Sequence, residues 1–408
     1  MKRVYLDNAA STSMDPEVLN EMIIHLKDTY GNASSLHSYG QKAHQVLEQS
    51  RAIIASFINA NKDEIFFTSS GTESDNLAIK GVSLKNRKLG NHIITSKIEH
   101  HAVLNPCKYL ENLGFQITYL NVDKYGLVNL NELKEVITDK TILISIMFAN
   151  NEIGTIEPIS EIGEIAKNNN IIFHSDAVQA FGKIPIDVEE MKIDLLSASA
   201  HKLYGPKGVG LLYIRKRNKK VGDKRYIEPL LHGGGHERGL RSSTENIPGI
   251  VAFAKAVEIC KHNMNEETTR LIKFRKRIIK EITENIDDVY LNGHPTQRLP
   301  NNVNLGFRYI EGESIVLNLD IEGIAVSTGS ACSSKTLEPS HVLLAIGQKA
   351  EEAHGSLRIT MGRFTTEDDI EYFLKKLPPI IARLRKISPF KKEKKFIFEK
   401  NELKIQSH

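Results

Sequence analysis

The 408-residue sequence predicts an α/β fold, with a large domain built on a mainly parallel sheet and a smaller C-terminal α+β domain. Short apolar runs rich in β-branched residues recur along the first half of the chain, with helix-like stretches between several of them. This alternation is typical of a parallel sheet covered by helices. The chain is also longer than one ordinary domain, so a second domain is expected.

The strands of the large domain are expected where Ile, Val, Leu, Phe and Thr gather in short runs between polar segments. These runs are residues 64–68, 92–95, 116–120, 141–146, 171–173, 195–197 and 208–214.

Helices are expected between these strands. Asp15 before Pro16 is a capping residue followed by the proline that first helical turns favour. The other helices expected in the large domain cover residues 41–58, 77–82 and 160–167. A long helix from about 248 to 279 leads into the second domain, with strands near 303–307 and 357–361 and helices near 313–319 and 368–385.

This pattern divides the chain into four parts. We expect residues 1–15 to form an arm that packs with the small domain and residues 16–255 to form the large domain. Residues 256–386 form the small domain, and residues 387–408 are a basic tail.

Composition excludes several classes of protein. The formal charge of +4 is too small to indicate nucleic-acid binding by itself, and no apolar run reaches the roughly 20 residues that span a bilayer. The first residues turn polar too early for a signal peptide. Three widely spaced cysteines exclude a disulfide framework and a self-contained zinc site, so we expect a reducing cytoplasmic location.

Two polar clusters follow apolar strands. Asp176 comes just after the run 171–173, and Lys202 comes after the run 195–197. Strand ends of α/β sheets meet at a ligand crevice. A lysine there can bond to the aldehyde of pyridoxal phosphate (PLP), and a carboxylate can keep the ring nitrogen protonated. The pair therefore predicts a PLP site.

Further residues suit the same ligand. Gly71 and Thr72 follow a strand and open a helix, which favours a phosphate, although plain helix capping is the alternative. His100 follows another strand and can stack on a ring or move protons, whereas His101 is assigned to the neighbouring structure. Gln179 lies three residues after Asp176, so both can face one ring.

Other candidates have a structural alternative beside the functional one. Ser199 and His201 suit a phosphate, and the amides of the segment 150–154 can bind a substrate or simply form a turn. Arg358, within a strand pattern, can bind a carboxylate or form a surface salt bridge. The glycine-rich loop 232–244 is a weak signal for a phosphate contact or a subunit interface.

The cysteines differ in their surroundings. Cys332 stands among small, polar residues, as expected of an accessible and reactive thiol. Cys107 and Cys260 stand among apolar residues, and we expect both to be structural.

Six motifs in order along the chain carry a resemblance to a known family. They are YLDNAA (5–10), GTESDN (71–76), NNEIG (150–154), HKLYGPKG (201–208), GGGHE (233–237) and GSAC (329–332). From Val4 to about Lys386 the chain resembles the NifS/IscS group of cysteine desulfurases, PLP-dependent enzymes of the aminotransferase class V family. The resemblance implies PLP fold type I, with a seven-stranded sheet in the large domain. It also implies conversion of L-cysteine to L-alanine.

The resemblance also implies roles for residues. Lys202 would form the Schiff base and remove the α-proton. Cys332, on a mobile loop, would take the sulfur of the substrate and hold it as a persulfide. His100 would stack on the ring and, as a third catalytic residue, move protons. The cofactor-binding residues would be Asp176 at the pyridinium, Gln179 at the phenolate oxygen, Gly71, Thr72, Ser199 and His201 at the phosphate, and Thr244 at the phosphate across a homodimer interface. Asn151 and Arg358 would bind the substrate.

The implied partners are a second copy of the chain and an iron–sulfur scaffold protein or another sulfur acceptor. Cys332 would be a metal ligand if it shared a nascent iron–sulfur cluster with the scaffold. A membrane or nucleic-acid partner is not expected, although the lysine run 391–395 leaves an RNA contact as an alternative to a solvated tail.

Two positions depart from the family pattern. Ala33 stands where proline is usual, and Ser243 stands where glycine is usual, just before Thr244. Three alternatives stay open at this point: a selenocysteine lyase, another enzyme of the same fold such as an aminotransferase, and a non-catalytic member.

Overall fold

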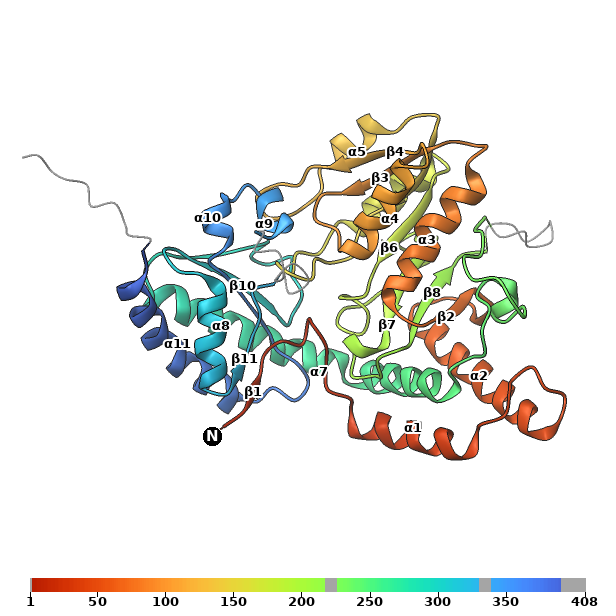
Figure 1. Ribbon diagram of the computed structural model, residues 1–408, viewed down its shortest axis with the longest axis horizontal. Coiled ribbons are helices and arrows are strands. Elements are labelled where there is room, and N and C mark those ends of the chain that lie inside the picture. The colour runs from red at the N-terminus through yellow and green to blue at the C-terminus, as the bar shows by residue number, and fades with distance from the viewer. Residues whose placement is uncertain (1, 217–225, 330–338, 390–408) are drawn as a thin grey trace, which may run out of the picture.

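A computed structural model describes residues 2–216, 226–329 and 339–389. The chain forms two lobes, joined by one long helix (Figure 1). The larger lobe is built on a seven-stranded sheet in the order β2-β8-β7-β6-β5-β3-β4. Its strands are β2 (Ile65–Thr68), β3 (His92–Ser96), β4 (Gln116–Leu120), β5 (Thr141–Ser145), β6 (Ile172–Asp176), β7 (Leu195–Ser199) and β8 (Gly210–Ile214).

The sheet is mainly parallel, as the sequence predicts. Only β8 runs antiparallel to its neighbours β2 and β7. Every residue of β3, β5, β6 and β7 is buried, because helices cover both faces of a parallel sheet. This arrangement explains why these strands read as nearly continuous apolar runs.

Helices cover the sheet and begin where local sequence favours a cap. Asp15 caps α1, and its side chain accepts a hydrogen bond from the amide of Glu17. The third helix starts at Gly71, six residues before the expected position, because Ser70 caps it directly after β2. The helices of this lobe are α1 (Pro16–Asp28), α2 (Ser38–Phe57), α3 (Gly71–Asn86), α4 (His101–Glu111), α5 (Leu130–Val136) and α6 (Ile159–Asn168).

The smaller lobe contains a three-stranded antiparallel sheet in the order β12-β10-β9. In addition, β1 of the N-terminal arm pairs in parallel with β11 of this lobe. The strands are β1 (Val4–Tyr5), β9 (Val289–Leu291), β10 (Asn302–Phe307), β11 (Ile324–Ala325) and β12 (Ser356–Thr360). The helices are α8 (Gly312–Ile321), α9 (His341–Ala345), α10 (Ala350–Ala353) and α11 (Glu367–Ile387).

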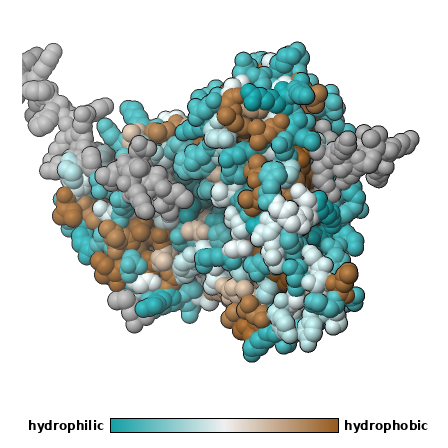
Figure 2. Space-filling model, turned by 45° about the vertical axis from the view of Figure 1, so that its right-hand side comes forward, coloured by the Kyte–Doolittle hydropathy of each residue, from teal (hydrophilic) through white to brown (hydrophobic). Residues whose placement is uncertain are grey.

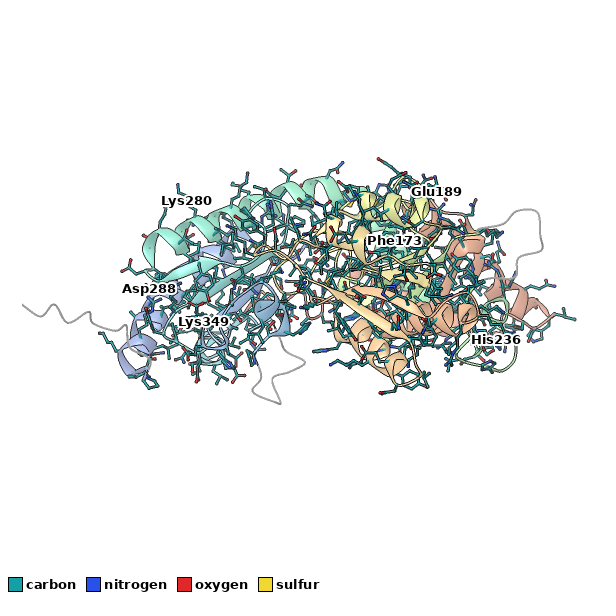
Figure 3. The ribbon with its side chains drawn as sticks, turned by 90° about the horizontal axis from the view of Figure 1, so that it is seen from above. Phe173, Glu189, His236, Lys280, Asp288 and Lys349 are labelled. Atoms are coloured by element: carbon teal, nitrogen blue, oxygen red, sulfur yellow. The ribbon has the colours of Figure 1, made fainter. Side chains whose placement is uncertain are left out.

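One helix belongs to both lobes. α7 (Ile247–Asn285) packs its first half on α1 and α2 and its second half on β9, β10 and α11. In Figure 3 it runs along one long side of the molecule, with Lys280 near its outer end and Phe173 inside the large lobe. The boundary that we place between residues 255 and 256 therefore lies within a continuous helix.

A small apolar cluster also connects the lobes. Ile98, Met147 and Ile153 of the large lobe pack against Val342 and Leu343, which lie on α9. The two lobes therefore share a packed contact beside the ends of the strands.

The surface carries apolar side chains in several places (Figure 2). On α8, Leu317 and Ile321 are 65% and 69% exposed. Others gather on α1 and the segment that follows it, where Leu26, Tyr30 and Leu36 are exposed. No helix in the described part of the chain is both long enough and apolar enough to cross a membrane.

Candidate active site

A cavity of about 260 Å³ lies at the carboxyl ends of the parallel strands, with walls from both lobes. The small lobe contributes Gly329, His341 and Arg358, the N-terminal arm contributes Ala9 and Ala10, and the large lobe contributes the rest. Strand ends and helix N-termini converge at this edge of an α/β sheet, where ligands bind. The predicted site residues that line the cavity are Gly71, Thr72, His100, Asn151, Asp176, Gln179, Ser199, His201, Lys202 and Arg358.

Lys202 ends a short 3₁₀ helix (Ala200–Lys202) directly after β7. Its ammonium donates hydrogen bonds to the carbonyl oxygens of Ala9 and Ala10, at 2.6 and 2.7 Å. Because these carbonyls belong to the N-terminal arm, the arm holds the amine at the wall of the cavity.

Asp176 is the last residue of β6 and is only 6% exposed. One carboxylate oxygen accepts a hydrogen bond from the amide of Val178 at 2.9 Å. Burial raises the pKa of Asp176 to about 6, although the Val178 amide and the charge of Lys202 oppose the rise. A buried carboxylate is stabilised by a cation, so the position suits a protonated ring nitrogen.

Near Asp176 lies a second buried acid that the sequence analysis missed. Asp75 on α3 is 1% exposed, and its Oδ1 has no hydrogen-bond partner among the described residues. Nε2 of His174 lies 3.6 Å from that oxygen and hydrogen-bonds with the hydroxyl of Ser197. Burial and the charge of Asp176 raise the pKa of Asp75 well above its ordinary value, which favours the protonated acid. The sequence signal that could have identified Asp75 is an acidic residue on the buried face of α3, the helix whose N-terminus opens into the site.

His100 is held by the helix that it begins. As the cap of α4, its Nδ1 accepts a hydrogen bond from the amide of Ala102 at 3.1 Å. This places the ring proton on Nε2. Burial, and next the charge of Lys202, lower the pKa of His100 to about 4. The ring is therefore neutral and can stack on a planar ligand.

His101, which was assigned to the neighbouring structure, also lines the cavity. His100 has an extended backbone and His101 is the first helical residue, so adjacent side chains both reach the cavity. The ring of His101 packs on His341 of α9, with 4.9 Å between the ring centroids. His341 was also missed, and its Nε2 lies 2.9 Å from the carbonyl oxygen of Glu99.

The N-terminus of α3 opens into the cavity. The hydroxyl of Ser70 accepts a hydrogen bond from the amide of Glu73, whereas the amides of Gly71 and Thr72 have no partner among the described residues. Such amides, with the helix dipole, bind anions. A Cβ at Gly71 would lie 2.6 Å from Cγ2 of Val178, so glycine keeps this end of the cavity open.

Three further predicted residues line the same cavity. Ser199 ends β7 and is buried. Nδ1 of His201 lies 3.2 Å from the hydroxyl of Ser11, and burial, with the charge of Lys202, lowers the pKa of His201 to about 4. The side-chain amide of Gln179 donates to the carbonyl oxygen of Ala9 at 2.9 Å and has a second N–H that can donate to a ligand.

Arg358 reaches the cavity from β12 but already has partners. Its guanidinium donates to the carbonyl oxygens of Asn151 and Gly329, at 3.1 and 3.3 Å, and forms an ion pair with Asp7 at 2.9 Å. Its Nε is buried without a partner among the described residues. A substrate carboxylate would therefore compete with Asp7 for this arginine.

Thr244 stands apart from this cavity within the single chain. It lies at another cavity of about 190 Å³, together with Glu237 and Arg241. Ser243 has a φ of 128°, in the region where glycine is less strained, which matches the departure seen in the sequence. A contact of Thr244 with the main cavity would need a second copy of the chain.

Cys332 lies outside the described residues. The two described cysteines, Cys107 and Cys260, are both buried, as expected for structural residues. The described ranges 2–216, 226–329 and 339–389 contain no group of three or more His, Cys, Asp or Glu side chains that could hold a metal ion.

The cavity fits PLP by its own chemistry. A helix N-terminus with free amides suits the phosphate, the buried carboxylate of Asp176 suits the ring nitrogen, and Lys202 suits the aldehyde. The neutral ring of His100 can cover the ring face. Together, the fold and the cavity define a lysine-bearing α/β enzyme of the PLP-dependent class.

Comparison with known proteins gives the family. The family model described as Aminotransferase class-V matches residues 4–373, and the chain belongs to this family. It is 55% identical over 394 residues to the protein named cysteine desulfurase IscS from Dictyoglomus turgidum, covering 96% of this chain and 98% of that protein. It is 54% identical over 390 residues to the protein of the same name from Clostridium botulinum, covering 95% and 96%.

Solved structures agree with this assignment. A structure described as a NifS-like protein superposes with a TM-score of 0.87 at 40% identity, covering 94% of this chain and all of that one. The family and the fold class predicted from the sequence motifs are therefore confirmed.

Proposed function

We propose that this chain is a PLP-dependent cysteine desulfurase, which takes sulfur from L-cysteine and leaves L-alanine. The observation that carries the proposal is the single cavity in which Lys202, Asp176 and His100 meet the N-terminus of α3. Relatives that match the chain over nearly their whole length bear the name of this activity.

The residues around the cavity divide the binding of the cofactor among them. Asp176 holds the ring nitrogen, Gln179 uses its second N–H for the phenolate oxygen, and His100 stacks on the ring. Gly71, Thr72, Ser199 and His201 hold the phosphate. When bound, PLP supplies an electron sink for the carbon atoms of an attached amino acid.

Two residues carry out the chemistry. The unprotonated amine of Lys202 removes the α-proton of the substrate and can return a proton. The thiolate of Cys332 attacks the substrate sulfur, and the bond between this sulfur and the β-carbon breaks. The electron pair of that bond stays with the carbon, which takes up a proton and becomes the methyl group of alanine. Cys332 keeps the sulfur as a persulfide, so no external oxidant or reductant is needed.

Substrate binding is assigned to Asn151 and Arg358. The guanidinium of Arg358 suits the carboxylate of cysteine because it can form two parallel hydrogen bonds. Its ion pair with Asp7 keeps the charge compensated before substrate arrives.

The partners are part of the same proposal. A homodimer would cover the exposed apolar side chains of α1 and the following segment, and would bring Thr244 to the phosphate of the second copy. The acceptor of the persulfide sulfur is an iron–sulfur scaffold protein or another sulfur acceptor, with which Cys332 could ligate a nascent cluster. The proposed compartment is the cytoplasm, where a thiol stays reduced.

Substitution of Cys332 by serine separates cofactor binding from sulfur transfer. We expect Cys332→Ser to keep the visible absorbance of bound PLP but to lose sulfide release from L-cysteine with a reductant present. Lys202→Ala should lose the absorbance of the lysine-bound cofactor. Sulfide release at the wild-type rate by Cys332→Ser would refute the role of the thiol, and an unchanged spectrum in Lys202→Ala would refute the role of the lysine.

A further inference from the structure

A second, much smaller cavity lies on the other side of Lys202. Its volume is about 20 Å³, enough for about one water molecule. Lys202 lines both this cavity and the main one, so its side chain forms part of the wall between them. Lys183, Cys260, Glu267 and Thr268 also line the small cavity, and none of them has a role in the proposed function.

Lys183 is connected to the catalytic lysine through hydrogen bonds. Its ammonium donates to the carbonyl oxygen of Gln179 at 2.8 Å. The side-chain amide of Gln179 donates to the carbonyl oxygen of Ala9, which also accepts a hydrogen bond from Lys202. Gln179 and the carbonyl group of Ala9 therefore form a short bridge, with the ammonium group of Lys183 at one end and that of Lys202 at the other.

No negative charge in the small cavity is available to compensate Lys183. Glu267 is ion-paired with Arg363 at 2.5 Å, and Arg363 is paired again with Asp15 at 2.7 Å. Lys183 forms no ion pair with a carboxylate of the described residues. Burial raises the pKa of the Cys260 thiol to about 11, so Cys260 stays neutral.

The other titratable groups near Lys183 are Tyr204 and His201, which are neutral, whereas the buried carboxylate of Asp176 acts on Lys202. Tyr204 is buried, which raises the pKa of its phenol and keeps it neutral. His201 is kept neutral by burial and by the charges of Lys202, Lys207 and Lys183, in that order. Burial, and then the charge of Lys202, lower the pKa of Lys183 itself to about 7.

We propose that Lys183 is a positioning residue that competes with the amine of Lys202 for one proton, so that Lys202 can act as a nucleophile and base near neutral pH. Two like charges in one confined, partly buried site are not both fully ionised, and each lowers the proton affinity of the other. The inference rests on the role of Lys202 in the proposed function. Lys183 itself contacts neither the main cavity nor the reacting atoms.

The test is a pH titration of the visible absorbance of the holoenzyme. We expect Lys183→Met to raise the midpoint by about one pH unit or more, the size of shift that a nearby like charge causes. Lys183→Arg keeps the charge and should restore a midpoint close to that of the wild type. Lys261→Met is the matched control, because it removes an exposed lysine next to Cys260 of the small cavity and should leave the midpoint in place.

An unchanged midpoint in Lys183→Met, in a protein with the wild-type melting temperature, would overturn the inference but leave the proposed function intact. Absence of a lysine-bound cofactor band in the wild type would instead overturn the proposed function.

A reciprocal measurement does not depend on the folding of Lys183→Met. Coupling between two groups is mutual. Lys202→Ala should therefore raise the pH at which Lys183 reacts with acetic anhydride, read by mass spectrometry. No change in that reactivity profile would contradict the coupling.

Discussion

Glu99 illustrates how one buried residue can set the response of the whole protein to pH. It lies between β3 and His100 and is fully buried. One carboxylate oxygen accepts hydrogen bonds from the hydroxyl of Ser96 and the amide of Met147, at 2.7 and 2.9 Å. The other has no partner among the described residues, and burial raises the pKa of Glu99 to about 8.

We predict that Glu99→Gln makes the stability less dependent on pH. Because the pKa of Glu99 is raised in the folded state, its stabilising contribution is complete below about 4.5 and is lost as the pH rises through about 8. Ionisation of the buried acid costs several kcal/mol at most, at about 1.4 kcal/mol for each unit of pKa shift. Melting temperatures from pH 5 to 9 should fall more steeply for the wild type than for the variant.

The control for this experiment is Glu161→Gln, which changes an exposed glutamate on α6. Its melting profile should follow that of the wild type. Parallel profiles for Glu99→Gln and the wild type would show that Glu99 is already ionised at low pH, and the prediction would be wrong.

At the scale of single elements, the start of α1 connects the two lobes. Oδ1 of Asp15 accepts a hydrogen bond from the amide of Glu17 at 2.9 Å, and Oδ2 forms an ion pair with Arg363 of the small lobe at 2.7 Å. The amide of Asp15 also donates to the carbonyl oxygen of Tyr204. One side chain therefore caps a helix and joins the lobes.

We predict that Asp15→Ala is destabilising and that Asp15→Asn is less so. The alanine variant loses the cap, worth about 1 kcal/mol, and also the buried ion pair, so the total is about 2–4 kcal/mol. The asparagine variant keeps a capping oxygen and loses only the charge. Urea unfolding measures both, and Asp28→Ala at the exposed end of α1 is the control that should stay near the wild type. Equal losses in the two Asp15 variants would mean that the cap contributes nothing.

The elements also show where sequence reasoning succeeds. The start of α1 was predicted at Pro16 because a capping residue and a proline stand together, and the seven strands of the large lobe were found because most of them are apolar runs, whereas the short strands β1, β9 and β11 were not predicted. Gly71 was expected to open α3, but only residues 77–82 were counted as helix because the stretch from Glu73 to Asn76 is polar, and Ser74 and Asp75 are buried only through their position against the sheet. Polar residues inside a core are visible only after tertiary packing is known.

Site residues could be predicted from the sequence where the residue type and its place after a strand together suggest a chemical role. Lys202, Asp176 and the glycine that opens α3 follow strands directly, and the structure brings them to one cavity. His341 could not be placed from sequence, because it meets the site through a contact between distant segments. Spacing along the chain carries no information about such contacts.

At the scale of the whole molecule, the two lobes form one unit around the cavity. The N-terminal arm pairs with β11 of the small lobe and also accepts the hydrogen bonds of Lys202, while α7 runs through both lobes. Thr244, however, lies at a separate cavity of the same chain. If the proposed homodimer completes the phosphate site, then each site depends on two chains.

We therefore predict that two inactive variants restore activity when they are mixed. Thr244→Asp places a negative charge against the phosphate bound by the second copy, and Lys202→Ala removes the amine from its own chain, so each homodimer should be inactive. In a mixed dimer one site has both defects and the other has none. Random pairing makes about half of the dimers mixed, so co-expression should give about a quarter of the wild-type rate of sulfide release.

Mixing Lys202→Ala with Asp176→Asn is the control: both residues lie in one cavity of one chain, so every site carries a defect and no activity should return. Recovery limited to the Thr244 pair would establish both the dimer and the shared site, whereas no recovery in either mixture would place Thr244 outside the phosphate site.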